Sequence, residues 1–174
     1  MTPIKGAILL RILLLLPLLL AGCAVAPPPY VYHYIPGRTA VMRGGFAVAP
    51  PAAPEEVQIA VAAGNRISGT PYVYGAGHDG RREFDTAYDC SGAASFVLKA
   101  AGLLDSPMPS LGFRHYGESG PGRWITIYAR RDHVFLVIAG LRYDTGWNGG
   151  HHGPQWTMRT RPTDECVLRH PEGL

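Results

Sequence analysis

Residues 88–102 read YDCSGAASFVLKAAG, and this stretch decides the fold. Apolar side chains recur along it with the spacing of a helix, so we expect a helix that starts near Asp89 and ends at Gly102. Cys90 then falls in the first turn, where unpaired backbone N–H groups and the helix dipole favour a thiolate and lower the thiol pKa. Cys90 is therefore a candidate nucleophile.

The residues after Cys90 support this interpretation, because Ser91 and Gly92 are small enough for a substrate backbone to approach closely. The alternative is a disulfide from Cys90 to Cys166, since exported proteins occupy compartments where disulfides persist. A purely structural cysteine would more naturally lie deep on the apolar face of the helix. We therefore favour a reactive Cys90 and interpret Cys166 as a small buried apolar residue.

The segments around this helix predict an α+β fold. Upstream, Pro54-Glu55-Glu56 suits the positive start of a helix that runs towards Ile67, and a loop follows to Tyr88. Downstream, three strand-like runs follow one another at 124–130, 133–139 and 141–145. Helices followed by an antiparallel meander are typical of an α+β fold in which N-terminal helices pack on the sheet.

His133 opens the second of these strands and is the candidate base. A thiolate nucleophile needs a base to move its proton, and a third group to hold that base in one tautomer. A histidine at a strand end is often only packed or solvated. Its combination with Cys90 at a helix start favours catalysis, because a helix-borne cysteine facing a sheet-borne histidine is the papain-like arrangement.

Asp144 is the candidate third group. If Ala139-Gly140 is a two-residue turn, the pairing of the hairpin places Asp144 opposite Phe135. Side chains alternate along a strand, so Asp144 projects on the same face as His133 and lies diagonally from it. Its carboxylate would accept Nδ1–H from His133 and fix the tautomer.

Three alternatives to this role for Asp144 stay open. Its carboxylate can pair with Arg142 or cap the turn at Gly146 instead. His151 or His152 can fold back over the site and take the same role. A one-residue slip of register would also exchange the two faces of the hairpin.

Three motifs together resemble the NlpC/P60 family of cell-wall cysteine peptidases. They are Gly69–Gly75 (GTPYVYG), Asp89–Gly92 (DCSG) at a helix start, and His133-Val134 at a strand start. The resemblance covers residues 55–146. It implies a papain-like α+β core and hydrolysis of amide bonds in peptidoglycan stem peptides. The usual target in the family is the bond between D-γ-glutamyl and a diamino acid such as meso-diaminopimelate.

The resemblance also implies roles for individual residues. Cys90 matches the nucleophile and His133 the base. Tyr72 matches a tyrosine that lines the site and helps to hold the oxyanion. Asp89 and Ser91 match positions that contact the free amine end of the stem peptide.

Two departures from the family pattern bear on the substrate groove. Residues 77–86 (GHDGRREFDT) make the loop before the cysteine longer than usual, so we expect a different groove. The strand Pro-Gly-Asp-Leu-Val-Phe-Phe is absent, and 121–127 (PGRWITI) stands in its place. The alternative function is that of a non-catalytic envelope lipoprotein that binds peptidoglycan or assists an envelope machine, with Cys90 as a relic.

The first 22 residues predict a lipoprotein signal peptide. Lys5 and Arg11 precede an apolar run from Ile12 to Leu20, and the uncharged stretch from Ile12 to Cys23 is too short to span a membrane comfortably. Leu20–Cys23 (LAGC) resembles a bacterial lipobox, which makes Cys23 the lipidation site and its acyl chains a membrane anchor. Ala24 favours sorting to the outer membrane, facing the periplasm. An ordinary cleaved signal or an anchor helix is the alternative.

Composition limits the organisation and the partners of the mature chain. The full chain of 174 residues suffices for one domain with appendages. We expect a Pro- and Ala-rich tether over 23–54 and one domain over 55–174, although 149–174 carries no motif. Without Lys5 and Arg11 the 16 basic residues become 14 against 13 acidic ones, a balance that argues against nucleic-acid binding.

The chain also lacks the usual metal-site spacings. Its histidines, His151-His152 among them, do not have the helical i, i+4 spacing of a metalloprotease, and Cys90 and Cys166 do not form a CxxC pair. We therefore predict that the protein uses no metal and no cofactor.

Overall fold

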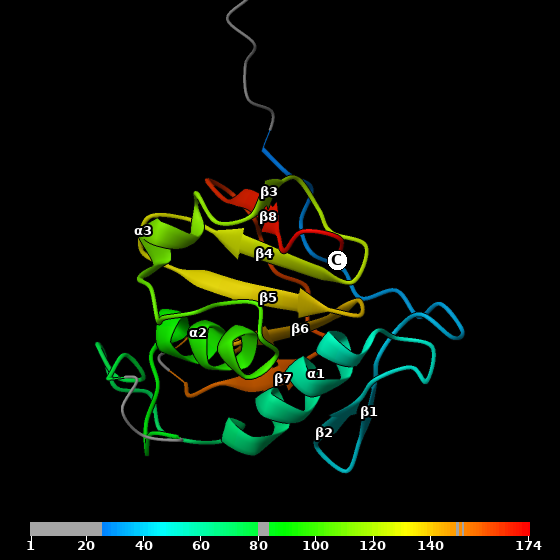
Figure 1. The fold of residues 1–174 in the computed structure, drawn as a ribbon, viewed down its shortest axis with the longest axis horizontal. Helices are drawn as coiled ribbons and strands as arrows, with labels where there is room; N and C mark the ends of the chain where they lie inside the picture. Colours follow the sequence, from blue (N-terminus) through cyan, green and yellow to red (C-terminus); the bar gives the residue numbers. More distant parts are fainter. Residues whose placement is uncertain (1–25, 80–83, 149, 151) are drawn as a thin grey trace, which may run out of the picture.

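A six-stranded antiparallel sheet in the order β3-β8-β4-β5-β6-β7 forms the centre of the protein (Figure 1). The structure is a computed structural model that describes residues 26–79, 84–148, 150 and 152–174. In chain order the elements are β1 (Val41–Arg43), β2 (Phe46–Val48), α1 (Glu55–Ile67), α2 (Cys90–Ala100), α3 (Ser110–Phe113), β3 (Glu118–Ser119), β4 (Ile125–Ala129), β5 (Val134–Ile138), β6 (Leu141–Asp144), β7 (Gln155–Thr157) and β8 (Val167–His170). The mixed helix-and-sheet fold agrees with the predicted α+β class.

The central strands β4, β5 and β6 form the predicted meander. The turn at Ala139-Gly140 pairs Ile138 with Leu141 and Leu136 with Tyr143, which is the expected register. Both faces of β5 are covered, and Val134, Leu136 and Ile138 are almost fully buried. Packing therefore fixes the register of the hairpin, because a slip of one residue would exchange the side chains that pack on its two faces.

The two outer strands β7 and β8 come from the tail in which no motif was found. β7 pairs with β6, and β8 lies between β4 and β3. They contain only three and four residues, and β8 is half-buried along its whole length. Neither strand therefore shows the alternation of apolar and polar residues by which strands are recognised in a sequence.

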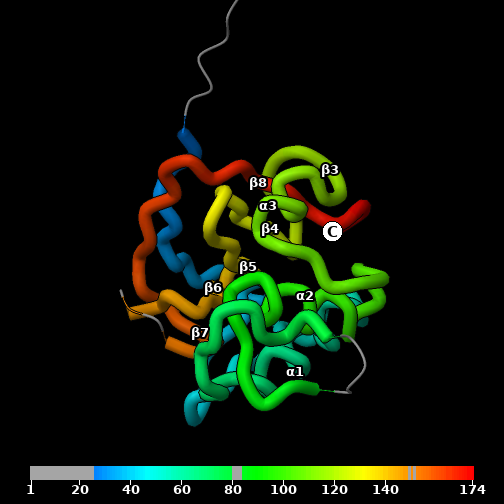
Figure 2. The backbone as a smooth tube through the Cα atoms, turned by 90° about the vertical axis from the view of Figure 1, so that its left-hand side faces the viewer, coloured from blue at the N-terminus to red at the C-terminus, as the bar shows by residue number. Residues whose placement is uncertain are grey.

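Helices α1 and α2 pack together on one face of the sheet (Figure 2). Both lie where the sequence predicts them, with Pro54 at the N-cap of α1 and Asp89 at the N-cap of α2. Gly64 of α1 faces the indole of Trp156, and a Cβ at this position would lie 2.6 Å from the ring. The close approach seats α1 on β7 and buries Trp156.

The segment before α1 corrects the predicted tether. The described part of it is 26–54. Its first residues run along the face of the sheet opposite the helices (Figure 2), and the hairpin β1–β2 that follows packs against α1 (Figure 1). Tyr30 is only 5% exposed, and its hydroxyl donates to the carbonyl of Gly140. The Asn65 side chain accepts from the N–H of Ala47 at 2.9 Å and donates to its carbonyl at 2.8 Å. Aromatic and small apolar side chains therefore bury enough area for this segment to join the domain.

The predicted signal peptide and Cys23 lie outside the described residues. Within the described part of the chain, no helix is long and apolar enough to cross a membrane.

Candidate active site

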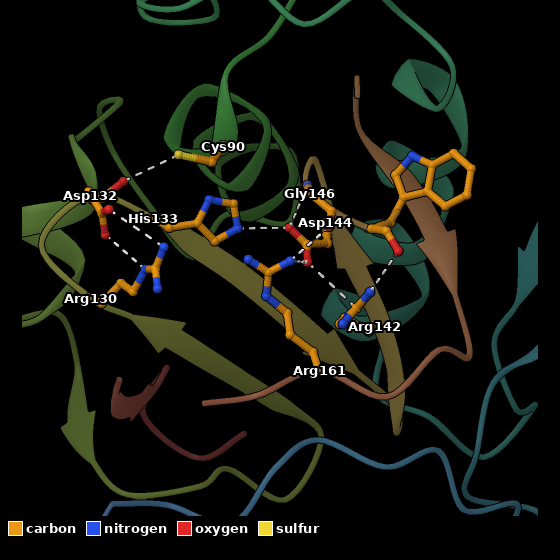
Figure 3. Close-up of polar contacts among 10 residues, drawn as sticks. Cys90, Arg130, Asp132, His133, Arg142, Asp144, Gly146 and Arg161 are labelled. Atoms are coloured by element: carbon orange, nitrogen blue, oxygen red, sulfur yellow. Dashed lines mark hydrogen bonds and ion pairs between the residues drawn. The ribbon is translucent and has the colours of Figure 1, made fainter. Parts of the chain in front are cut away.

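Three elements bring Cys90, His133 and Asp144 together. Cys90 opens α2, His133 immediately precedes β5, and Asp144 ends β6 (Figure 3). Nε2 of His133 lies 2.8 Å from Oδ1 of Asp144. The prediction that Asp144 shares a face with His133 is therefore confirmed by the register and by this contact.

The orientation of the imidazole corrects the sequence-based expectation. The expectation placed Nδ1–H of His133 on Asp144, whereas the structure places Nε2 there. The two residues are diagonal neighbours across the hairpin, so the ring reaches along the strand with its distal nitrogen. The opposite edge of the ring faces Cys90, and the thiol and imidazole interact (Figure 3).

Asp144 is saturated with donors although its side chain is completely buried. Oδ1 also accepts the N–H of Gly146 at 3.0 Å, and Oδ2 accepts from Nη1 of Arg161 at 2.7 Å. Nε of Arg142 lies 3.6 Å from Oδ2. Two of the alternatives, pairing with Arg142 and capping at Gly146, are thus realised together with the contact to His133.

These contacts favour the charged form of each partner. Burial raises the pKa of Asp144, but His133, Arg161 and the Gly146 N–H together lower it below its usual value. Burial lowers the pKa of His133, but the hydrogen bond and charge of Asp144, together with Cys90, raise it above its usual value. The site therefore stabilises an imidazolium next to the thiol.

Cys90 is poised to lose its proton. Burial raises the pKa of the thiol, but the hydrogen bond and charge of His133, together with Ser110 and the backbone of Val134, lower it overall. The hydroxyl of Ser110, at the start of α3, lies 3.4 Å from the sulfur. Cys90 and Cys166 are both free, so the disulfide alternative is wrong. Cys166 is half-buried rather than fully buried as expected.

Tyr72 lies at the entrance of the site. It lines a cavity of about 370 Å³ together with His133, Thr145 and Arg161. Partial burial raises its pKa, and the negative charges of Cys90 and Asp89 raise it further. The Tyr72 hydroxyl therefore keeps its proton at this wall of the cavity.

Asp89 organises the loop before α2. Its carboxylate accepts the backbone N–H of Gly92 at 2.7 Å, as the N-cap of the helix, and that of Gly75 at 2.9 Å. Ser91 donates its hydroxyl to the same carboxylate at 3.1 Å. The Asp89 and Ser91 side chains are both buried, and the hydrogen bonds within the protein explain why these two residues are present. Their contact with a stem-peptide amine remains a prediction.

Gly92 serves the loop rather than the substrate. A Cβ at this position would lie 2.2 Å from the carbonyl oxygen of Ala76 and 2.9 Å from Cα of Gly77. The expectation that Gly92 admits a substrate backbone is therefore wrong, because the preceding loop already fills that space.

Several residues of the site were missed by sequence reasoning. His78, from the long loop, lies 3.1 Å from Asp89 and 3.2 Å from Ser91 through Nε2. Ser110 follows two prolines that mark a helix start, but nothing local places it beside Cys90. Arg161 belongs to the tail, and its approach to Asp144 depends on how β7 folds back along β6. No sequence signal identifies such contacts, because only the tertiary fold creates them.

No family model and no curated protein matches this chain. Among solved structures, NlpC1 from Trichomonas vaginalis is similar, with a TM-score of 0.51 and 15% sequence identity. The match covers 69% of this chain and 45% of that structure, so the chain spans less than half of its length. The likeness supports an NlpC-like α+β fold for this protein.

Proposed function

We propose that this protein is a cysteine peptidase that hydrolyses an amide bond in peptidoglycan stem peptides, between D-γ-glutamyl and a diamino acid. The observation that supports it most is the arrangement of a depressed-pKa thiol, Cys90, against one edge of His133, with Asp144 on Nε2 at 2.8 Å. This is the nucleophile, base and orienting group that acyl transfer requires. The NlpC-like fold supports the choice of substrate class.

The proposed reaction has two steps. The Cys90 thiolate attacks the amide carbonyl carbon, and the backbone N–H of Cys90 and the Tyr72 hydroxyl stabilise the oxyanion. The His133 imidazolium gives its proton to the leaving nitrogen, the C–N bond breaks, and a thioester remains. His133 then takes a proton from water, which attacks the thioester. The acid product leaves and the Cys90 thiolate is regenerated.

The proposed setting is the cell envelope. A lipid-modified Cys23 would hold the protein on the outer membrane, facing the periplasm, where stem peptides are accessible. The ordered segment 26–54 would then attach the domain closely beneath that anchor, rather than on a long tether.

The role of the thiol is tested by cell-wall hydrolysis with the full chain. We expect Cys90→Ala to lower the rate by at least about 10³-fold, since an activated nucleophile supplies that order of acceleration. Cys166→Ala is the matched control, because Cys166 is free and lies outside the site, and it should retain the rate. Iodoacetamide should abolish hydrolysis and a chelator should not.

The opposite pattern would identify a different function. Hydrolysis that survives in Cys90→Ala would overturn the thiol mechanism. A cellular phenotype that Cys90→Ala restores in full, with no hydrolysis by either protein, would identify the non-catalytic envelope lipoprotein instead.

A further inference from the structure

A groove of about 760 Å³ lies between the N-terminal segment and the face of the sheet opposite the helices (Figure 2). Residues within 28–39 line one wall, and Val137 of β5 with the turn at 139–140 lines the other. The groove shares no lining residue with the cavity beside His133, which precedes the start of β5. A ligand here would therefore leave the candidate active site open. We call this feature the N-terminal groove.

Two cations meet at one side of the groove. Arg38 and Arg123 both line it, and their guanidinium carbons lie 5.7 and 5.9 Å from the centre of the Trp124 ring. Both arginines are exposed, and neither forms an ion pair within the described part of the chain. No acidic side chain of the described residues lines the groove. Because a guanidinium fork matches phosphate oxygens, these two arginines suit a phosphate group.

The segment beside these cations exposes apolar side chains. Val31, Tyr34 and Ile35 are 44%, 59% and 53% exposed. The whole segment 26–54 contains two arginines and no aspartate or glutamate. Exposed aromatic and aliphatic side chains next to arginines are suited to the boundary between lipid headgroups and acyl chains, and their positive charge complements an anionic membrane surface.

The place of the predicted lipid anchor favours a membrane lipid over a free anion. Cys23 precedes Pro28, the first residue of the groove, by five residues. Five residues span at most about 18 Å even when fully extended. Acyl chains on Cys23 would therefore hold the groove within reach of the lipid headgroups.

We propose that the N-terminal groove binds the headgroup phosphate of an anionic phospholipid in the membrane that carries the anchor. The inference rests on the proposed setting, in which Cys23 is lipidated. Arg38 and Arg123 hold the phosphate, and the apolar side chains at 31–35 enter the headgroup region. The groove face then lies on the membrane while the cavity beside His133 stays accessible to substrate.

The first test measures lipid binding without a bilayer. Dihexanoyl phosphatidylglycerol, kept below its micelle concentration, is titrated into the full chain, and the indole N–H signal of Trp124 is followed by NMR. We expect saturable binding that Arg38→Gln and Arg123→Gln each weaken about fivefold, the usual effect of one basic residue at an anionic lipid. Arg43→Gln, an exposed arginine of β1 outside the groove, is the matched control and should leave binding unchanged. Inorganic phosphate should bind more weakly than the lipid.

The second test locates the docked face on a bilayer. The lipidated full chain is reconstituted into phosphatidylglycerol-containing vesicles whose acyl chains are brominated, and tryptophan fluorescence is measured. We expect quenching of the added emission in Ile35→Trp and none in Ile59→Trp. Ile59 is the matched control because it is a partly exposed isoleucine of α1, across the sheet from the groove. The unmodified protein gives the background of the three native tryptophans.

The outcomes separate this inference from the proposed function. No saturable lipid binding, or equal weakening by Arg43→Gln, overturns the lipid site. Inorganic phosphate that binds as tightly as the lipid assigns the groove to a free anion and overturns the membrane partner. Equal quenching in both tryptophan variants overturns the docked face.

Failure of the proposed setting or function has its own readouts. A Cys23 without acyl chains, seen by mass spectrometry, would contradict the setting and overturn the anchored docking. Hydrolysis that does not depend on Cys90 would contradict the function. Arg38→Gln should keep the hydrolysis rate on a soluble stem peptide, because the groove lies outside the candidate active site.

Discussion

Asp144 is the residue on which the charge state of the site depends most. It is buried, it contacts Nε2 of His133 at 2.8 Å, and it raises the pKa of that imidazole above its usual value. The raised pKa keeps His133 protonated beside the Cys90 thiolate over a wider range of pH. The reactive ion pair therefore exists between the depressed thiol pKa and the raised imidazole pKa.

We predict that Asp144→Asn moves the alkaline limb of the kcat/KM profile to lower pH. The sign follows from the pKa, because removing the carboxylate charge lowers the imidazole pKa and His133 loses its proton earlier as the pH rises. The rate at the original optimum should fall about 10- to 100-fold, the value of a charge-assisted hydrogen bond. The profile is measured by initial rates on a synthetic stem peptide.

The control for this prediction is His152→Ala, which removes a rival for the orienting role and should keep the profile of the unmodified protein. Asp144→Asn also leaves Arg142 without its charge partner, and breaking a buried pair costs about 3–5 kcal/mol. Rates are therefore corrected for the folded fraction, measured by circular dichroism. An unmoved alkaline limb in Asp144→Asn, or a lost rate in His152→Ala, would assign the orientation of His133 to another group.

At the scale of elements, β5 and β6 were predictable and the outer strands were not. The turn at Ala139-Gly140 and the continuous apolar run fixed both strands and their register, and the register in turn placed Asp144 beside His133. The loop from 77 to 86 was noticed only for its length. His78 of this loop contacts Asp89. The contact was not predicted, because a histidine in an aperiodic loop has no pattern from which its contacts can be inferred.

Asn65 tests whether the segment before α1 is part of the folded domain. Its side chain makes both hydrogen bonds that join α1 to Ala47 of β2. We predict that Asn65→Ala lowers the free energy of unfolding by about 1–3 kcal/mol, because two backbone groups lose their partner. The measurement is urea denaturation of the full chain, with limited proteolysis to locate early cleavage within 26–54.

The matched control is Gln58→Ala, on the exposed side of the same helix, where the side chain makes one bond to the carbonyl of Ala53. We expect it to cost less than Asn65→Ala, because water can replace a partner at an exposed position. Equal stability of the unmodified chain and Asn65→Ala, with no new cleavage, would show that the hairpin β1–β2 contributes nothing to the fold.

At the scale of the whole molecule, the hairpin β5–β6 is completed by parts distant in sequence. Arg161, from the tail, contacts Asp144, and Tyr30, from the N-terminal segment, packs under Arg142. Residues 23–54 were predicted to form a tether, because this segment is rich in proline and alanine and shows no helical or strand periodicity. The three-dimensional fold gives those residues a sheet face to cover, which a local reading of the sequence cannot provide.

The central claim is that Cys90, His133 and Asp144 hydrolyse a stem-peptide amide, and mass spectrometry of digested sacculi tests it most directly. Purified sacculi are incubated with the full chain, and the released fragments are analysed for new termini. We predict fragments that end in D-glutamate with a free γ-carboxyl, matched by fragments that begin with a free amine on the diamino acid. Cys90→Ala should release neither. New termini at another bond, or the same fragments from Cys90→Ala, would contradict the account.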